Sequence, residues 1–131
     1  MIIGIGIDLI DNRRIQKTLN KFGTKFKKRC FSYNENINSN KKFNKVNYYS
    51  KRYAAKEACS KALGTGLTKG IYWKDIEVVN NDSGKPQIIL YNNALKILNK
   101  LSKKKCNIEV SLSDERNYSI ANVVIFENEN K

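Results

Sequence analysis

Apolar residues recur along the chain with two periods, and these periods mark the elements that we expect. Residues 2–10 are β-branched and apolar with two glycines, which predicts a buried first strand. Asp11-Asn12 then offers a cap for a helix that begins near Arg13. Apolar residues follow along this helix at helical spacing: Ile15, Leu19, Phe22 and Phe26. The first helix is therefore expected to be amphipathic, with a basic outer face.

The middle of the chain contains its clearest helical pattern. Residues 34–47 are polar and rich in Asn and Lys, so we expect a surface loop or short helical turns there. Residues 48–64 carry small apolar residues three and four positions apart, as in a helix with one closely packed face. Gly64-Thr65-Gly66 then ends the helix, because glycine readily adopts the conformation found at helix C-termini.

The second half of the chain has the pattern of strands around one more helix. Two strand-like runs, 71–79 and 87–91, flank a segment dense in turn residues, which predicts a hairpin. A helix and two strands follow: residues 92–103, 108–113 and 118–126. We therefore expect an α+β fold over residues 1–131, a single domain with a mostly antiparallel sheet packed around a long central helix.

The net charge limits the classes of partner that the protein is expected to bind. Lys and Arg number 25 against 12 Asp and Glu, giving +13, which favours nucleic acid, phosphorylated ligands, acidic proteins or anionic lipid. A nucleic-acid-binding module without catalytic activity is the leading alternative, since aromatic residues accompany the charge: Tyr48, Tyr49, Tyr53, Tyr72 and Trp73. No known nucleic-acid motif is present, and we expect neither a nucleic-acid nor a membrane partner.

The chain contains no histidine, which excludes several classes of catalytic mechanism and of metal site. Ser-His-Asp and Cys-His nucleophiles, histidine-bound zinc and an imidazole base are all ruled out. The three cysteines, Cys30, Cys59 and Cys106, show no CxxC spacing and indicate free thiols in a reducing compartment. Asp8 interrupts the apolar opening and no basic segment precedes it, so we expect no signal peptide and a cytoplasmic protein.

The helix at 48–64 concentrates the chemistry. Its polar residues recur on the side away from the small apolar residues: Arg52, Lys56, Glu57, Ser60, Lys61 and Gly64. One interpretation is a solvated surface with ion pairs one turn apart. The other is a site for a polyphosphate and a divalent cation, with the cations on phosphate and Glu57 on the metal. Asp8, which ends an apolar strand, is either a helix cap or a second carboxylate ligand for Mg²⁺.

These residues lie in blocks that resemble the holo-[acyl-carrier-protein] synthase family, the 4′-phosphopantetheinyl transferases of the fatty-acid type. The blocks come in the family's order along nearly the whole chain: residues 4–9, 52–66, 73–78, 84–86 and 111–113. The central block is the most specific, reading Arg-Tyr-Ala-Ala-Lys-Glu-Ala-Cys-Ser-Lys-Ala-Leu-Gly-Thr-Gly.

The resemblance implies the phosphopantetheinyl transferase fold and a Mg²⁺-dependent reaction. In it, 4′-phosphopantetheine passes from coenzyme A to a serine of apo-acyl carrier protein, releasing adenosine 3′,5′-bisphosphate. Asp8 and Glu57 match the family's metal ligands. Other positions match its coenzyme A cleft: Arg52, Lys56, Ser60, Lys61, Gly64, Lys85, Pro86, Ser111 and Ser113. The family also implies a homotrimer whose clefts lie between subunits.

Physical chemistry gives these residues their expected roles. Attack on a pyrophosphate needs charge neutralisation and in-line positioning more than covalent help. We expect Mg²⁺ on Asp8 and Glu57 to neutralise the pyrophosphate, and Lys61 to add positive charge at the transferring phosphoryl group. Without histidine, the base is a carboxylate or a metal-polarised water, and we favour Glu57 or Asp8 acting through water.

The first helix gains a role from the same resemblance. The family docks its acidic carrier protein on this helix, and the basic face supplies the cations: Arg13, Arg14, Lys17, Lys21 and Lys25. Arg13 or Arg14 is expected to be the main docking residue, with Arg14 preferred, because a guanidinium can bind a carboxylate through two hydrogen bonds at once.

One position departs from the family. Histidine usually follows the Ser-Leu-Ser block, whereas this chain has Asp114. A carboxylate there repels phosphate, so either a neighbouring lysine takes over or the 3′-phosphate of coenzyme A sits differently. Two alternatives to a fatty-acid-type synthase follow: an inactive homologue that Asp114 has disabled, and a transferase acting on carriers of polyketide or peptide synthesis.

Overall fold

The computed structural model describes residues 1–68 and 70–129, which contain five strands, five α-helices and one 3₁₀ helix. In chain order these elements are β1 (Ile2–Asp11), α1 (Asn12–Phe22), α2 (Thr24–Cys30), α3 (Tyr33–Ser39), α4 (Lys45–Ala62), η1 (Trp73–Asp75), β2 (Ile76–Asn80), β3 (Pro86–Leu90), α5 (Asn92–Leu101), β4 (Cys106–Asp114) and β5 (Tyr118–Glu127).

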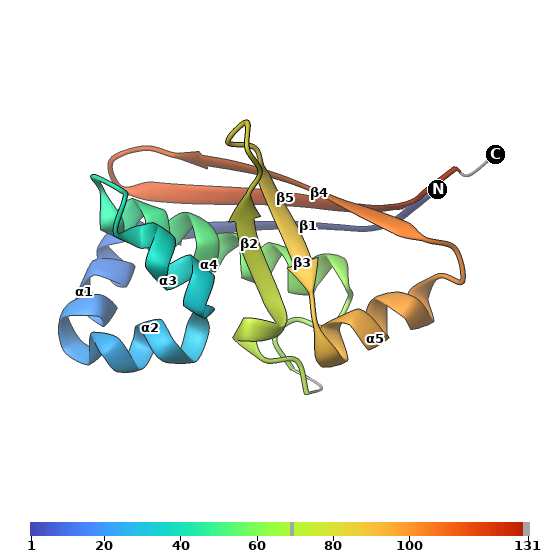
Figure 1. Ribbon diagram of the computed structural model, residues 1–131, viewed down its shortest axis with the longest axis horizontal. Helices are drawn as coiled ribbons and strands as arrows, with labels where there is room; N and C mark the ends of the chain where they lie inside the picture. Colours follow the sequence, from blue (N-terminus) through green and yellow to red (C-terminus); the bar gives the residue numbers. More distant parts are fainter. Residues whose placement is uncertain (69, 130–131) are drawn as a thin grey trace.

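The long strands form one antiparallel sheet in the order β1-β5-β4, so β1 and β4 are its two edges. Helix α4 packs along one face of this sheet, and the short α1–α3 gather at one end of the molecule (Figure 1). The core lies between sheet and helix, where Ala54, Ala58, Val123 and Ile125 are fully buried. The expected α+β fold with a central helix is confirmed.

The predicted hairpin is also confirmed, as a separate two-stranded sheet of β2 and β3. Its turn is held by the side chain of Asn81, whose Oδ1 accepts hydrogen bonds from the backbone N–H groups of Ser83 and Lys85. The strand begins at Ile76 instead of residue 71, because the preceding residues form η1, where the Asp75 carboxylate accepts from the Tyr72 N–H.

The first helix is shorter than the apolar spacing predicted. It ends at Phe22, and Phe26 belongs to a second helix, α2. Gly23 causes the break, since it adopts φ +49°, a left-handed value that favours glycine, and its N–H bonds the Leu19 carbonyl.

The polar segment after residue 33 contains more structure than a surface loop. Helix α3 begins with a capping box, in which Ser32 Oγ accepts from the Glu35 N–H and Glu35 Oε1 accepts from the Ser32 N–H. Glu35 and Ser39 are buried, so the short helical turns that we expected pack into the interior. In the part of the chain that the structure describes, no helix has the length and apolar content needed to cross a membrane.

Candidate active site at the edge of the sheet

Two glycines allow helix α4 to lie directly on strand β1. A Cβ atom added to Gly6 would collide with the Ala58 carbonyl oxygen, and one added to Gly4 would collide with that of Ala62. Both partners are backbone atoms of α4, which cannot move aside as a flexible side chain can. The Gly-Ile-Gly pattern of β1 and the alanines of α4 therefore place helix side chains within reach of the strand.

Three of the predicted catalytic residues meet at this edge. Lys61 Nζ lies 3.0 Å from Asp8 Oδ1 and also donates to the Ile7 carbonyl at 3.0 Å. Glu57 lies one helical turn before Lys61 on the same flank of α4 and is partly buried. Burial raises the pKa of Glu57, the Asp8 carboxylate raises it further, and Lys61 and Arg14 partly offset both effects.

The charge arrangement fits a hard divalent cation. Asp8 lies close enough to Glu57 for its negative charge to raise the pKa of Glu57, and a bound cation would offset that repulsion. Among residues 1–68 and 70–129, no three His, Cys, Asp or Glu side chains converge on one point. Two carboxylates with phosphate and water oxygens completing the shell is the pattern typical of Mg²⁺.

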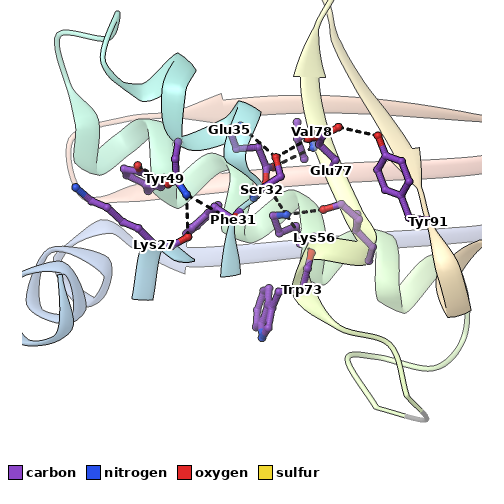
Figure 2. A network of polar contacts seen from close by, with 12 residues as sticks. Lys27, Phe31, Ser32, Glu35, Tyr49, Lys56, Trp73, Glu77, Val78 and Tyr91 are labelled. Carbon is purple, nitrogen blue, oxygen red and sulfur yellow. Dashed lines mark hydrogen bonds and ion pairs between the residues drawn. The ribbon is translucent and has the colours of Figure 1, made fainter. Parts of the chain in front are cut away.

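Lys56 and Ser60 do not join this cluster. Figure 2 shows Lys56 directed into the interior, where Nζ lies 2.8 Å from Glu35 Oε1 and also donates to the carbonyls of Trp73 and Ile76. Ser60 is buried and its hydroxyl donates to the Glu57 carbonyl at 2.7 Å. Burial lowers the pKa of Lys56, and Glu35 opposes that change. Neither side chain exposes an atom to a ligand, so their positions support structural roles instead of the expected coenzyme A contacts.

Arg52 lines a cavity on the opposite flank of α4. The guanidinium packs 3.9 Å from the Tyr48 ring centroid and donates to Asn80 Oδ1 at 3.2 Å, whereas its Nε has no hydrogen-bond partner in the described residues. The cavity measures about 350 Å³ and reaches the end of β4. It is lined by Lys42, Phe43, Asn44, Asn47, Tyr48, Lys51, Arg52, Asn80, Gly84, Pro86, Leu112 and Asp114. Three cationic side chains, Lys42, Lys51 and Arg52, therefore line this cavity, which favours an anion.

The remaining predicted cleft residues lie in three places. Pro86 lines the Arg52 cavity, and the neighbouring Lys85 pairs with Glu109 of β4 at 2.9 Å. Ser111 and Ser113 are exposed on the face of β4 turned away from α4. Gly64 follows the end of α4 with φ +84° and open space around its Cα.

Four of the predicted docking cations are exposed along α1, whereas Lys25, expected on the same helix, lies on α2. Arg13 is fastened to Asp11, with its Nη2 2.8 Å from the Asp11 carboxylate. Arg14 faces the catalytic edge closely enough to influence the pKa of Glu57. Lys17 and Lys21 continue the exposed face.

The two groups of polar residues lie at opposite edges of the sheet. Asp8 belongs to edge strand β1, whereas Asp114, beside the Arg52 cavity, belongs to edge strand β4. Sequence periodicity had placed Arg52 and Glu57 on one face, but five residues of helix turn them to different flanks. Within one chain the helix therefore separates the carboxylate cluster from the basic cavity.

Sequence reasoning missed Asn47 and Lys51, which fasten α4 to the end of β4. Asn47 Nδ2 donates to Asp114 Oδ2 at 2.8 Å, and Lys51 Nζ lies 3.3 Å from Asp114 Oδ1. Their spacing of one helical turn was the signal available in the sequence.

Comparisons with known proteins show the family to which this chain belongs. The 4′-phosphopantetheinyl transferase superfamily model matches residues 4–123. The holo-[acyl-carrier-protein] synthase of Agrobacterium fabrum is 47% identical over 127 residues, 95% of each chain. The crystal structure of the Neisseria meningitidis synthase matches with a TM-score of 0.85 and 34% identity, covering 97% of this chain and all of that one. The Bacillus anthracis synthase in complex with coenzyme A (3′,5′-ADP) matches with a TM-score of 0.80 and 35% identity, covering 98% of this chain and 99% of that one. This chain is a member of the holo-[acyl-carrier-protein] synthase family, within the 4′-phosphopantetheinyl transferase superfamily.

Proposed function

We propose that this protein transfers 4′-phosphopantetheine from coenzyme A to a serine of an acidic apo-acyl carrier protein, in a Mg²⁺-dependent reaction that releases adenosine 3′,5′-bisphosphate. The observation that carries the proposal is the convergence of Asp8, Glu57 and Lys61 at one sheet edge. Relatives with the synthase name are 43–47% identical to this chain, and the solved Bacillus anthracis and Helicobacter pylori synthases are in complex with coenzyme A.

The roles of the three residues follow from their charges. Asp8 and Glu57 would hold Mg²⁺, which supplies neutralisation of the pyrophosphate and of the leaving phosphate. Lys61 places an ammonium beside the same carboxylate pair and stabilises charge on the transferring phosphoryl group. Since the chain has no histidine, the serine proton passes through a water to a carboxylate of this pair.

Coenzyme A has a second anionic end, the 3′-phosphate of its ribose. With the pyrophosphate at Asp8 and Glu57, the 3′-phosphate needs a cationic site elsewhere. The Arg52 cavity provides one, because Lys42 and Lys51 line it together with Arg52. The cavity lies at the other edge of the sheet, so one chain does not present both sites to one ligand.

We propose that a homotrimer completes the cleft. The face of β1 turned away from α4 exposes Ile5, Ile7 and Leu9, which are 62%, 55% and 63% exposed. They pair across β5 with Val124, Asn122 and Ile120, and onward with Glu109, Ser111 and Ser113 of β4. The apolar side chains that β1 and β5 present on this face are typical of an interface, and contacts between unlike edges form a ring when the rotation between subunits closes. The catalytic edge of one subunit then meets the basic cavity of its neighbour.

Light scattering tests the assembly. The wild-type protein should have the mass of three chains, and Ile5→Glu should yield monomers that no longer transfer phosphopantetheine, because it places a charge in the apolar face. Leu95→Glu, on exposed α5, is the control and should remain trimeric. A monomeric wild-type protein with full activity would contradict the intersubunit cleft.

Helix α1 is the proposed docking surface for the carrier. Its exposed Arg14 lies beside the catalytic edge, where an incoming serine must arrive. Next to it lies an apolar cavity of about 490 Å³ with a basic rim, lined by Thr18, Phe22, Lys25, Phe26, Arg29, Cys30, Tyr53 and Trp73. Apolar pocket and cationic rim together suit an amphipathic, acidic partner.

The wider assignment rests on size and chemistry. We take residues 1–131 as one phosphopantetheinyl transferase domain, since the family model spans 4–123. Its substrates and its free cysteines, Cys30, Cys59 and Cys106, agree with a cytoplasmic enzyme of fatty-acid synthesis.

Release of adenosine 3′,5′-bisphosphate tests the donor half of the reaction. Chromatography of a mixture of protein, coenzyme A, Mg²⁺ and apo-carrier should show this product in proportion to modified carrier. Glu57→Gln should lower its rate at least about 100-fold, as expected when a metal ligand is lost. Glu129→Gln, an exposed carboxylate beyond the end of β5, is the matched control. A fully active Glu57→Gln variant would exclude Glu57 as a metal ligand.

A further inference from the structure

The cavity beside Arg52 contains one carboxylate among cations. Lys42, Lys51 and Arg52 line it together with Asp114. A bare carboxylate at this position would repel any phosphate that Arg52 attracts. The contacts of Asp114 decide whether it opposes anion binding or serves it.

Both oxygens of Asp114 are engaged by α4. Oδ2 accepts from Asn47 Nδ2 at 2.8 Å, and Oδ1 lies 3.3 Å from Lys51 Nζ. Asn47 also donates to the Glu115 carbonyl at 3.2 Å, which fixes its amide in this orientation. The carboxylate therefore joins the end of β4 to the N-terminal half of α4 and faces its own cation.

Lys51 is held at the cavity wall by this pair. Its side chain is 29% exposed and that of Asp114 is 32%, so both are partly screened from water. An ammonium has three N–H donors, and a single carboxylate oxygen uses one of them. Lys51 lines the same cavity as the adjacent Arg52, so an anion bound there can use the remaining donors.

The following inference rests on the proposed function. We propose that Lys51 is a specificity-determining residue for the 3′-phosphate of coenzyme A, and that Asp114 is the positioning residue that holds Lys51 in place. The pyrophosphate belongs at Asp8 and Glu57, on the opposite edge of the sheet, which leaves the 3′-phosphate as the anion for this cavity. Asp114 thus acts on phosphate through Lys51, and its charge is matched before any ligand arrives.

The donor preference of the enzyme tests this pair. The ratio of kcat/KM for coenzyme A to that for 3′-dephospho-coenzyme A isolates the 3′-phosphate, because the donors differ only there. Lys51→Met should lower this ratio about tenfold, as expected for the loss of one charge-assisted hydrogen bond. Lys51→Arg should retain most of it. Lys96→Met, on exposed α5, is the control and should keep the wild-type ratio.

Asp114→Asn separates positioning from repulsion. Asparagine keeps an acceptor for Asn47 but loses the charge that holds Lys51, so the ratio should fall, and the double variant with Lys51→Met should fall no further than Lys51→Met alone. A higher ratio in Asp114→Asn, or an unaltered ratio in Lys51→Met, would overturn the proposal.

Binding without catalysis distinguishes this inference from the proposed function. Calorimetry should show that the wild-type protein binds adenosine 3′,5′-bisphosphate more tightly than adenosine 5′-monophosphate. In Lys51→Met the ratio of these two affinities should be about tenfold smaller. If that preference depends on Lys51 while no phosphopantetheine is transferred, the inference stands and the proposed function fails. If the variant keeps the wild-type preference, the inference fails whatever the enzyme's activity.

Discussion

The buried pair of Lys56 and Glu35 gives the sharpest prediction about stability. Both side chains have no solvent-exposed surface, and their ion pair measures 2.8 Å. Replacing Lys56 with Met removes the cation and leaves the Glu35 carboxylate inside the protein, with only the N–H groups of Ser32 and Val78 as donors. Breaking one partner out of a buried pair costs about 3–5 kcal/mol in the free energy of unfolding. Since a domain of this size is stable by about 5–15 kcal/mol, Lys56→Met should lose a large share of that stability.

Urea denaturation at one fixed protein concentration measures this effect, because unfolding of an oligomer depends on concentration. The double variant Lys56→Met with Glu35→Gln should lose less than the sum of the two single variants, since no buried charge remains unpaired. Lys85→Met is the control: its partner is Glu109, both side chains are about half exposed, and the change should stay within about 1 kcal/mol.

Two results would refute this account of Lys56. One is a Lys56→Met variant as stable as Lys85→Met, which would mean that the interior pair contributes nothing. The other is a Lys56→Met variant, assayed where it is still folded, with wild-type stability and a raised KM for coenzyme A. That outcome would restore the ligand contact that the family resemblance implies.

The other predictions concern the catalytic edge and the docking helix. Gly6→Ala should abolish transfer and lower the unfolding midpoint, because its new Cβ collides with the backbone of α4; a variant with wild-type kinetics would contradict the close approach. Burial and the neighbouring Asp8 raise the pKa of Glu57, so the metal-free protein should lose stability as pH rises from about 4.5 through that raised value, and Mg²⁺ should reverse the loss. A carboxyl resonance of Glu57 titrating below its ordinary range without metal would disprove this. Arg14→Glu should raise the KM for the carrier at least about tenfold, and Arg13→Glu less, since Arg13 is already paired with Asp11; equal effects would show that the pairing is irrelevant to docking.

Local patterns in the sequence predicted the parts of the fold that neighbouring residues determine. The strand at 2–10, the central helix and the hairpin turn all depend on periodicity and turn chemistry that can be read within a short window, although the central helix begins at Lys45 instead of residue 48. The meeting of Asp8 and Glu57 was within reach too, because Gly4, Gly6 and the alanines of α4 indicate close packing. The continuous first helix was wrong because the pattern of apolar residues outweighed the signal from Gly23.

What the sequence could not supply were pairings between distant segments. Lys56 recurs with Arg52 at helical spacing, and nothing local shows that Glu35, 21 residues earlier, neutralises it inside the protein. Likewise, Asp114 is expected from the sequence to repel phosphate. The structure shows that Asn47 and Lys51, more than 60 residues away, form a hydrogen bond and an ion pair with its carboxylate. Burial of a charge depends on its partner, and the partner is set by the fold.

The most direct test of the central claim is the mass of the carrier. Apo-acyl carrier protein incubated with this enzyme, coenzyme A and Mg²⁺ should gain the mass of one 4′-phosphopantetheine on its serine, as measured by intact-protein mass spectrometry. The gain should disappear when Mg²⁺ is chelated and when Asp8 or Glu57 is replaced by its amide. A carrier whose mass does not change with the wild-type enzyme would contradict the assignment of Asp8, Glu57 and Lys61 as a phosphopantetheinyl transfer site.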